Sequence, residues 1–444
     1  MQRRRRYLAA LAAGATGLVA GCRGGDSDSE QTATPTPTSG STGEEPWQQT
    51  TRLSPAADEA DGFDRYGSAL ALDSDGTTAL VGAPGDGTSD HLEIGAAYVF
   101  VREDGDWTRQ TELTAPDRRG DERFGCSVAL SADGTTALVG ANGRPVNGVT
   151  SAGAAYVFSA AGRAWTRETE LTAPDGEFQD HFGSSVALSA DGTTALVGAP
   201  DVDGPDERQV GSAHVFTASD GDWTAETTLT GDMGPYAKFG TAVALSDDGA
   251  TALVGAKGAT VSGTYATGAA YVFAPDADGW RQQNELTADE GEGGDFFGNS
   301  VALSADGTTA LVGAADTDER IGAAYVFTDA GERWSQLAKL ADPNGDSDDQ
   351  FGASVALPAD GTTALVGAAT DEDPNGRRGG ATYVATDDGD GWTLTTKLDS
   401  AGGGEDDEFG TAVALDDEGT TALVGAPGAG GTDSVPEGHA YVFE

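Results

Sequence analysis

Cysteine, lysine and long apolar runs are scarce in this sequence, and each shortage narrows what the chain can be. Only two cysteines occur in 444 residues, Cys22 and Cys126, and they lie far apart in different contexts. A disulfide framework is therefore not expected to hold the fold together. The apolar stretch at 8–20 has thirteen residues, which is too short for a bilayer-spanning helix of about 20 residues.

Positive charge is scarce as well. The chain has 25 Lys and Arg against 73 Asp and Glu, a formal net charge of −48, and 38% of its residues are hydrophobic. Because the apolar residues recur in regular blocks, we expect a folded chain rather than a disordered one. The composition resembles that of proteins from extreme halophiles, whose carboxylates keep the surface hydrated in molar salt. Such a surface repels phosphate backbones, so nucleic acid is not expected as a partner.

Signatures of catalysis are also missing. The sequence contains no G-x-S-x-G elbow, phosphate-binding loop or dinucleotide fingerprint. Its four histidines stand singly in different parts of the chain, and acidic residues are too abundant for any pair to stand out. We therefore expect no enzymatic activity and no cofactor. Cys126 lies in "FGCSVAL", where the related segments carry Ser, Thr, Ala or Asn, and it is expected to be small, buried and unreactive.

The N-terminal residues carry the features of an export signal. Four arginines at 3–6 precede the short apolar stretch, and small residues lead to Cys22, as in a cleaved signal peptide. Arg4 and Arg5, followed by "RYL", resemble a twin-arginine signal, and "VAGC" resembles a lipobox, in which the cysteine is lipidated. The alternative is an ordinary secretory signal whose cysteine is incidental. We predict a lipoprotein signal peptide at 1–21 and a lipid on Cys22, anchoring the protein to the outer face of the cytoplasmic membrane.

A tether is expected to follow the lipidated cysteine. Residues 22–46 have no periodic apolar pattern and are rich in Thr, Ser, Pro and Gly. This composition is typical of a disordered linker. The folded part of the chain is therefore predicted to occupy residues 47–444.

The predicted folded part consists of seven sequence repeats. An aromatic residue followed by glycine recurs at intervals of 58, 58, 57, 58, 54 and 58 residues, at Tyr66, Phe124, Phe182, Phe239, Phe297, Phe351 and Phe409. The seven tryptophans fall one in each unit, and variants of "GTTALVGA" and "AYVF" accompany them. A fixed period of this length indicates a repeat architecture.

Each unit reads as four short strands separated by Gly, Asp and Pro clusters. In the third unit, residues 165–171 alternate, with Trp165, Arg167, Thr169 and Leu171 predicted on one face. The runs at 154–158, 182–188 and 194–199 are apolar or small on both faces. Strands buried on both faces belong inside a stack of sheets, whereas an amphipathic strand belongs at its edge.

These patterns predict an all-β fold, a seven-bladed β-propeller of four-stranded blades. An open solenoid would need atypical capping repeats, and the sequence has none. The chain enters with an edge-type strand at 47–53 and leaves after an "AYVF" strand. We predict that the N-terminal strand completes the last blade beside 438–443.

The repeated motifs resemble the FG-GAP repeat family, which builds integrin α-subunit propellers and many secreted prokaryotic proteins. "FG" occurs in six units and "YG" in the first, and "GAP" is literal at 82–84, 198–200 and 425–427. The family often carries a calcium loop, D-x-(D/N)-x-D-G-x-x-D, ahead of the GAP strand. In the third unit only Asp191 of its ligand positions remains, and the other units show the same loss. The calcium site is therefore not carried over, and Asp191 is expected to be a turn residue.

Other acidic loops are weaker candidates for a cation. Residues at alternate positions could supply oxygen ligands, first at Asp342, Asn344, Asp346 and Asp348, and then at Asp201, Asp203 and Asp206. In a chain this acidic, a solvated loop is the favoured interpretation of both.

The segments between the motifs point to recognition. The loops after GAP differ freely from unit to unit, and diverse loops on a rigid scaffold commonly bind partners. We expect a lipid-anchored cell-surface binding or adhesion module for an extracellular protein or glycan. The alternatives are a structural scaffold of the cell envelope and an envelope enzyme with an acidic site in the funnel.

Overall fold

The computed structural model describes residues 47–54, 64–87, 93–118, 120–205, 208–231, 233–277, 279–331, 333–372, 377–400, 403–430 and 437–444. The predicted signal peptide with Arg4 and Arg5, the lipidation site Cys22 and the predicted tether lie outside these ranges. Residues 46–444 form one compact unit. Within the described ranges, no helix is long and apolar enough to cross a membrane.

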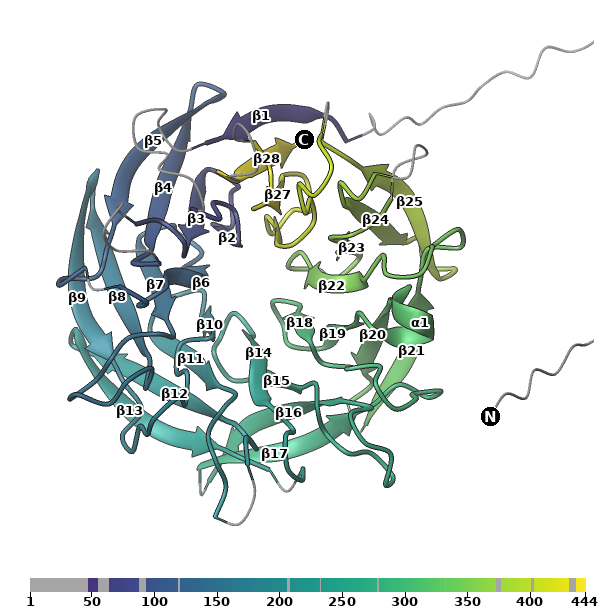
Figure 1. The fold of residues 1–444 in the computed structure, drawn as a ribbon, viewed down its shortest axis with the longest axis horizontal. Helices are drawn as coiled ribbons and strands as arrows, with labels where there is room; N and C mark the ends of the chain where they lie inside the picture. Colours follow the sequence, from purple (N-terminus) through teal and green to yellow (C-terminus); the bar gives the residue numbers. More distant parts are fainter. Residues whose placement is uncertain are drawn as a thin grey trace, which may run out of the picture. The chain divides into compact units, whose positions relative to one another are not determined.

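The compact unit is a seven-bladed β-propeller, as predicted. Seven four-stranded antiparallel sheets surround a central axis (Figure 1). The innermost strands, which begin at or near the aromatic-Gly motif, are β2 (Ala69–Leu72), β6 (Phe124–Leu130), β10 (Ser185–Leu188), β14 (Phe239–Leu245), β18 (Ser300–Leu303), β22 (Phe351–Ala356) and β26 (Val413–Leu415). The second strands, which carry "ALVGA", are β3 (Thr78–Ala83), β7 (Thr136–Ala141), β11 (Thr194–Ala199), β15 (Ala252–Ala256), β19 (Thr309–Ala314), β23 (Thr363–Ala368) and β27 (Ala422–Ala426).

The outer two layers follow in the same order. The third strands are β4 (Ala96–Glu103), β8 (Ala154–Ala161), β12 (Ser212–Ser219), β16 (Ala269–Asp276), β20 (Ala323–Asp329), β24 (Ala381–Asp387) and β28 (His439–Phe443). The outermost are β5 (Asp106–Leu113), β9 (Ala164–Leu171), β13 (Asp222–Leu229), β17 (Gly279–Leu286), β21 (Trp334–Leu340), β25 (Trp392–Leu398) and β1 (Gln49–Leu53). We number the blades 1 to 7 by their innermost strands, so that blade 1 is β2–β5 and blade 7 is β26–β28 with β1.

The ring closes at both its inner and its outer edge. Each innermost strand contacts the innermost strand of the next blade, and β26 of blade 7 contacts β2 of blade 1. At the outer edge, β1 pairs with β28 in an antiparallel register that sets Leu53 opposite Ala440. The backbone N–H of Gln48 donates to Glu444 O at 2.9 Å. Each sequence repeat therefore begins with the outermost strand of one blade and continues into the next blade.

The two glycines of the repeated motifs meet across every blade interface. A Cβ added at Gly198 of blade 3 would lie 2.1 Å from the carbonyl oxygen of Gly240 in blade 4. Gly240 has φ +85°, a conformation that side-chain-bearing residues avoid. The same approach, at 2.0 to 2.1 Å, occurs at all seven GAP glycines: Gly82, Gly140, Gly198, Gly255, Gly313, Gly367 and Gly425. The motif thus encodes backbone-to-backbone packing between blades.

Aromatic side chains fill the rest of each interface. Phe182 is fully buried, and its ring lies 5.9 Å from that of Phe216 in an edge-to-face contact. Its other ring neighbour is His214, at 5.3 Å, in the position that most other blades give to tyrosine. Burial of each such ring contributes roughly 1.5–3 kcal/mol, so seven equivalent clusters stabilise the ring together.

The predicted face assignment of the outermost strands is wrong in one respect. A β-bulge lies between the pairs Val157↔Thr169 and Phe158↔Arg167, so the alternation reverses within β9. As a result, Trp165 packs in the interface between blades 1 and 2, whereas Leu171 packs in the interface between blades 2 and 3. An extra residue on one strand reverses which side chains face inward, and all seven outermost strands carry such an irregularity.

One end of the ring carries the tight turns between the first two strands of each blade, and we call it the hairpin rim. There Asp191 is a turn residue, as predicted: its Oδ1 accepts the Thr193 N–H at 2.9 Å and the Ser189 hydroxyl at 2.7 Å. One backbone N–H in each turn also donates to the equivalent carbonyl of the next blade. These seven bonds, 2.9 to 3.2 Å long, run in a closed circuit through Ser74, Ala132, Ala190, Asp247, Ala305, Ala359 and Asp417 and return to Ser74.

Candidate functional site

The other end of the ring carries the loops that follow each second strand and the loops that join successive blades. We call it the GAP rim. Its loops differ in structure although they start from equivalent positions. The loops 142–153 and 257–268 form small hairpins closed by Val146↔Val149 and Val261↔Thr264, while blade 5 carries the single helical turn α1 (Thr317–Arg320). Variation on a constant frame makes this rim the candidate functional surface.

A buried carboxylate supports the start of almost every innermost strand. It lies two residues before the aromatic-Gly motif in six blades, at Asp64, Glu122, Asp180, Asp295, Asp349 and Asp407, and blade 4 has Ala237 instead. Asp180 Oδ2 accepts the Glu177 N–H at 2.5 Å and so fixes the loop that enters the blade. These carboxylates were not predicted from the sequence, although an acid at a fixed offset from the motif is visible there in six units.

Burial changes the acidity of several of these groups. It raises the pKa of Asp180 and Asp295, and it raises the pKa of Asp349 to about 6. Asp349 Oδ2 accepts the Asp346 N–H at 2.6 Å, while its buried Oδ1 has no hydrogen-bond partner among the described residues. A buried carboxylate with one unsatisfied oxygen is costly to ionise.

In blade 2 the same position belongs to a charged network. Arg144, whose side chain is 9% exposed, lies 2.5 Å from the fully buried Glu122. Asp117 approaches the guanidinium at 3.2 Å and Glu170 at 3.4 Å. This network joins the loop after β7 to the loop that enters the blade, so it fixes the rim rather than leaving a charge free to bind a ligand.

The predicted cation candidates of blade 6 do not converge on one point. Asp342 accepts the Asn344 N–H at 2.9 Å, and its Oδ2 lies 2.6 Å from the Tyr383 hydroxyl. Asp348 pairs with Arg320 at 3.0 Å, and the Asp346 N–H serves Asp349. No group of three or more His, Cys, Asp or Glu side chains in the described part of the chain is arranged to hold a metal ion.

The second predicted cation loop is also engaged in other contacts. Asp201 lies 2.6 Å from His181 Nδ1 and pairs with Lys238 of blade 4. Asp203 Oδ1 accepts the Gln209 N–H at 2.8 Å, and Asp206 lies outside the described residues.

His214 is buried among hydroxyls, and burial lowers its pKa to about 4.

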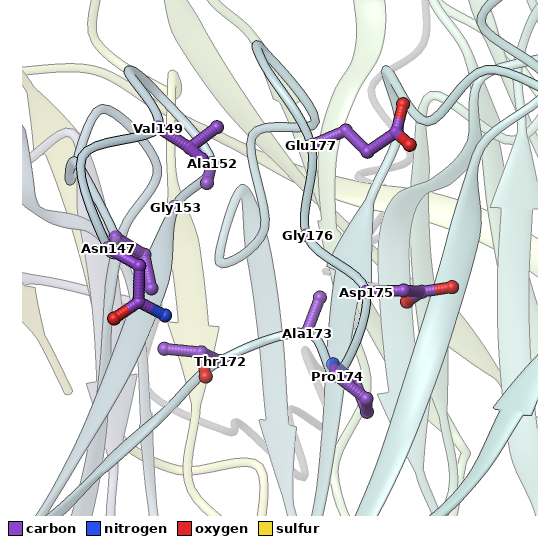
Figure 2. Close-up of a pocket in the computed structure, with 11 residues that line it drawn as sticks. Asn147, Val149, Ala152, Gly153, Thr172, Ala173, Pro174, Asp175, Gly176 and Glu177 are labelled. Atoms are coloured by element: carbon purple, nitrogen blue, oxygen red, sulfur yellow. The ribbon is translucent and has the colours of Figure 1, made fainter.

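Two cavities lie between loops of the GAP rim. The first, of about 390 Å³, opens between the hairpin 142–153 and the loop after β9. Figure 2 shows Asn147 and Val149 on one side of it and Ala173, Pro174 and Gly176 on the other. The second, of about 540 Å³, lies in blade 4 and includes Met233, Tyr271, Gln282 and Glu285 in its wall.

A third cavity, of about 650 Å³, lies where the innermost strands of blades 1, 2 and 7 begin. Its wall includes Ser68, Cys126 and Thr411, each directly after the glycine of an aromatic-Gly motif. Cys126 is therefore half-buried at the cavity wall, and the prediction that it is buried is wrong. Burial raises the pKa of its thiol, and Sγ lies 3.4 Å from Gly183 O.

Comparison with known proteins agrees with the architecture. The FG-GAP repeat profile matches seven segments of the chain, at 47–100, 107–158, 165–216, 223–273, 280–327, 334–385 and 392–443. No curated protein matches the sequence. The matched segments begin at the outermost strand of one blade and end at the third strand of the next, as the structure requires of a repeat that closes its own ring. The chain belongs to the FG-GAP repeat family.

Proposed function

We propose that the protein is a lipid-anchored cell-surface module that binds an extracellular protein or glycan through the GAP rim. One observation carries this proposal. The seven blades share one frame, yet the GAP rim combines loops of different structure with the three cavities described above. A rigid platform that varies on one face suits recognition of a partner. The anchor is proposed from the sequence at Cys22.

A loop exchange tests the binding proposal. The hairpin tips 145–150 and 260–265 are both six residues long and are closed by Val146↔Val149 and Val261↔Thr264. They can be exchanged with little change in length or backbone, while Arg144 stays beside Glu122. The immobilised protein, in molar salt, is exposed to envelope extract and to a glycan panel. We expect one saturable ligand whose capture is lost after the exchange. The matched control exchanges the outer hairpins 103–106 and 219–222 on the hairpin rim, which should leave capture unchanged.

A single substitution tests the proposed membrane anchor. Cys22→Ser should move the protein from the membrane fraction to the medium without affecting capture. A stoichiometric partner that copurifies and resists the loop exchange would instead favour the scaffold alternative. Turnover that is lost on replacing one acidic side chain would favour the enzyme alternative.

A further inference from the structure

One position of the GAP rim has the same backbone conformation in all blades, but its side chain is basic in some blades and not in others. The residue directly before the aromatic-Gly motif has a φ between +53° and +59° in every blade: Arg65, Arg123, His181, Lys238, Phe296, Gln350 and Glu408. Such a conformation is uncommon for residues with side chains. Because the backbone is the same each time, the seven side chains leave equivalent points around the axis, where the innermost strands begin (Figure 1).

Basic residues occupy this position in four successive blades. They are Arg65, Arg123, His181 and Lys238 of blades 1 to 4, in a chain that has only 25 Lys and Arg against 73 Asp and Glu. Lys257, at the start of the next loop of blade 4, extends the group. Burial, together with the positive charge of Lys238, lowers the pKa of Lys257. We call these five residues the basic arc.

The middle of the basic arc is paired, but its ends are not. Arg123 Nε lies 2.8 Å from Glu93 Oε2, and Asp201 serves both His181 and Lys238. The side chains of Arg65 at one end and Lys257 at the other make no hydrogen bond or ion pair with any described residue. Two cations without partners in so acidic a protein are available to an anionic ligand.

The third cavity gives the basic arc a shaped site. Arg65, Arg123, Glu93, Ser68 and Thr411 contribute to its wall, so guanidinium groups stand beside hydroxyls and a carboxylate. Asn142 adds an amide, and Pro84 and Gly85 add an apolar face. At about 650 Å³ it falls in the range of small-ligand sites. Guanidinium groups bind planar anions in a bidentate manner, while the surrounding polar groups match the hydroxyls of a sugar.

We propose that the basic arc and this cavity bind the carboxylate or sulfate group of an acidic sugar within a glycan. The proposal rests on the proposed function, because it names the ligand class of the same rim. Arg65 pairs with the anionic group, Ser68, Thr411 and Asn142 bond the sugar hydroxyls, and Pro84 packs on the ring. Lys257, at the other end of the arc, attracts a further acidic sugar of the glycan.

Titration calorimetry of the full chain in molar salt tests this site. The probes are trigalacturonate, its neutral methyl ester, a sulfated galactose trisaccharide and a hexa-aspartate peptide. We expect trigalacturonate or the sulfated trisaccharide to bind, and comparison of the two shows whether the site takes a carboxylate or a sulfate. The methyl ester and the peptide should not bind. Arg65→Gln should weaken the binding about tenfold or more, and it should fold normally because Gln350 occupies the same position in blade 6.

Arg163→Gln is the matched control. Arg163 lies in an outer hairpin of the hairpin rim, its side chain is 74% exposed, and its loss should leave binding unchanged. The proposal is overturned if neither anionic sugar binds, if Arg65→Gln has no effect, or if the acidic peptide binds equally well. If these results coincide with a ligand whose capture depends on the loop exchange, the proposed function survives and only this inference fails.

Discussion

The two rims are built from one backbone but put it to opposite uses. On the hairpin rim, seven near-copies of one turn are tied together by a closed circuit of hydrogen bonds. Every turn has an acid at its third position: Asp75, Asp133, Asp191, Asp248, Asp306, Asp360 and Glu418. On the GAP rim, loops, cavities and charge differ from blade to blade. Uniformity at one end therefore holds the ring, and the other end can vary without opening it.

The pKa values of the buried acid before the aromatic-Gly motif and of the turn acid on the hairpin rim are shifted in opposite directions in several blades. On the GAP rim, burial raises the pKa values of Asp180, Asp295 and Asp349. On the hairpin rim, burial acts in the same direction on Asp133, Asp191 and Asp306, but hydrogen bonds from neighbouring Ser and Thr outweigh it and lower their pKa values. The hydrogen-bonded turn position of the hairpin rim thus stabilises an ionised carboxylate, whereas the buried position two residues before the aromatic-Gly motif disfavours one.

The largest expected effect is the difference in stability lost when a glycine is replaced in a blade interface and on the hairpin rim. Gly240 and Gly221 have nearly the same φ, +85° and +87°, but a Cβ at Gly240 would lie 2.3 Å from Ser212 O, while one at Gly221 meets nothing within 4 Å. Gly221→Ala should cost only backbone strain, about 1–2 kcal/mol. Gly240→Ala should lower the free energy of unfolding by more than about 4 kcal/mol. Urea unfolding followed by tryptophan fluorescence measures both, and equal losses would contradict the packing role of the motif.

A smaller effect contrasts charge pairs on the two rims. Glu122 of the GAP rim is fully buried against Arg144, whereas Glu103 of the hairpin rim pairs with Arg163 while its side chain is 53% exposed. Glu122→Gln should destabilise the protein by about 3 kcal/mol, because Arg144 loses its buried partner. Glu103→Gln should cost less than about 1 kcal/mol. The same unfolding experiment compares them, and a silent Glu122→Gln would show that Asp117 and Glu170 neutralise Arg144 without it.

The smallest expected effect is a difference between the two rims in how the free energy of unfolding changes with pH. The folded-state pKa of Asp349, about 6, lies above the ordinary aspartate value of 3.8. The folded state therefore holds a proton that the unfolded state has lost, and stability falls as pH rises from about 4 to 6. Asp349→Asn removes this dependence and should be more stable than the wild type at pH 7 by about 1–2 kcal/mol, allowing for partial solvation of the site.

Asp191→Asn is the opposite case on the hairpin rim. The pKa of Asp191 is lowered, so its contribution is present above the unfolded pKa and is lost as pH falls through the folded value. Asp191→Asn should be less stable than the wild type at pH 7, and the gap should close in acid. Melting temperatures of both variants between pH 3 and 7 test the pair, and slopes of the same sign would refute the contrast.

The fold was predictable because its determinants are local and repeated. The aromatic-Gly motif, the GAP glycine and the tight turn recur at a nearly constant interval, and that interval identifies the blades. The faces of β9 were not predictable in the same way. Residues 165–171 alternate equally well with or without a bulge, so the sequence does not reveal that Trp165 and Leu171 enter different interfaces.

The candidate site was less predictable, since it depends on equivalent positions in space. Arg65 and Lys238 are 173 residues apart in the sequence. Both directly precede the aromatic-Gly motif, but only the closed ring and the shared backbone conformation place them on one arc. The spacing of Asp342 and Asp348 resembled that of a cation-binding loop. However, the Asp342 carboxylate accepts a hydrogen bond from Tyr383, which lies 41 residues further along the chain. Long-range partners of this kind leave no trace in the spacing.

The circuit of hydrogen bonds on the hairpin rim has a further consequence. All seven bonds are donated in the direction of the chain, from one blade to the next, and the last returns to the first. In a helix, peptide dipoles align along one axis and sum to a macrodipole. Here the bonded groups follow one another around a circle, so their dipoles cancel as vectors. The circuit therefore adds no net dipole in the plane of the ring, and the charge of this end comes from the turn acids and from outer-hairpin residues such as Glu103 and Arg163.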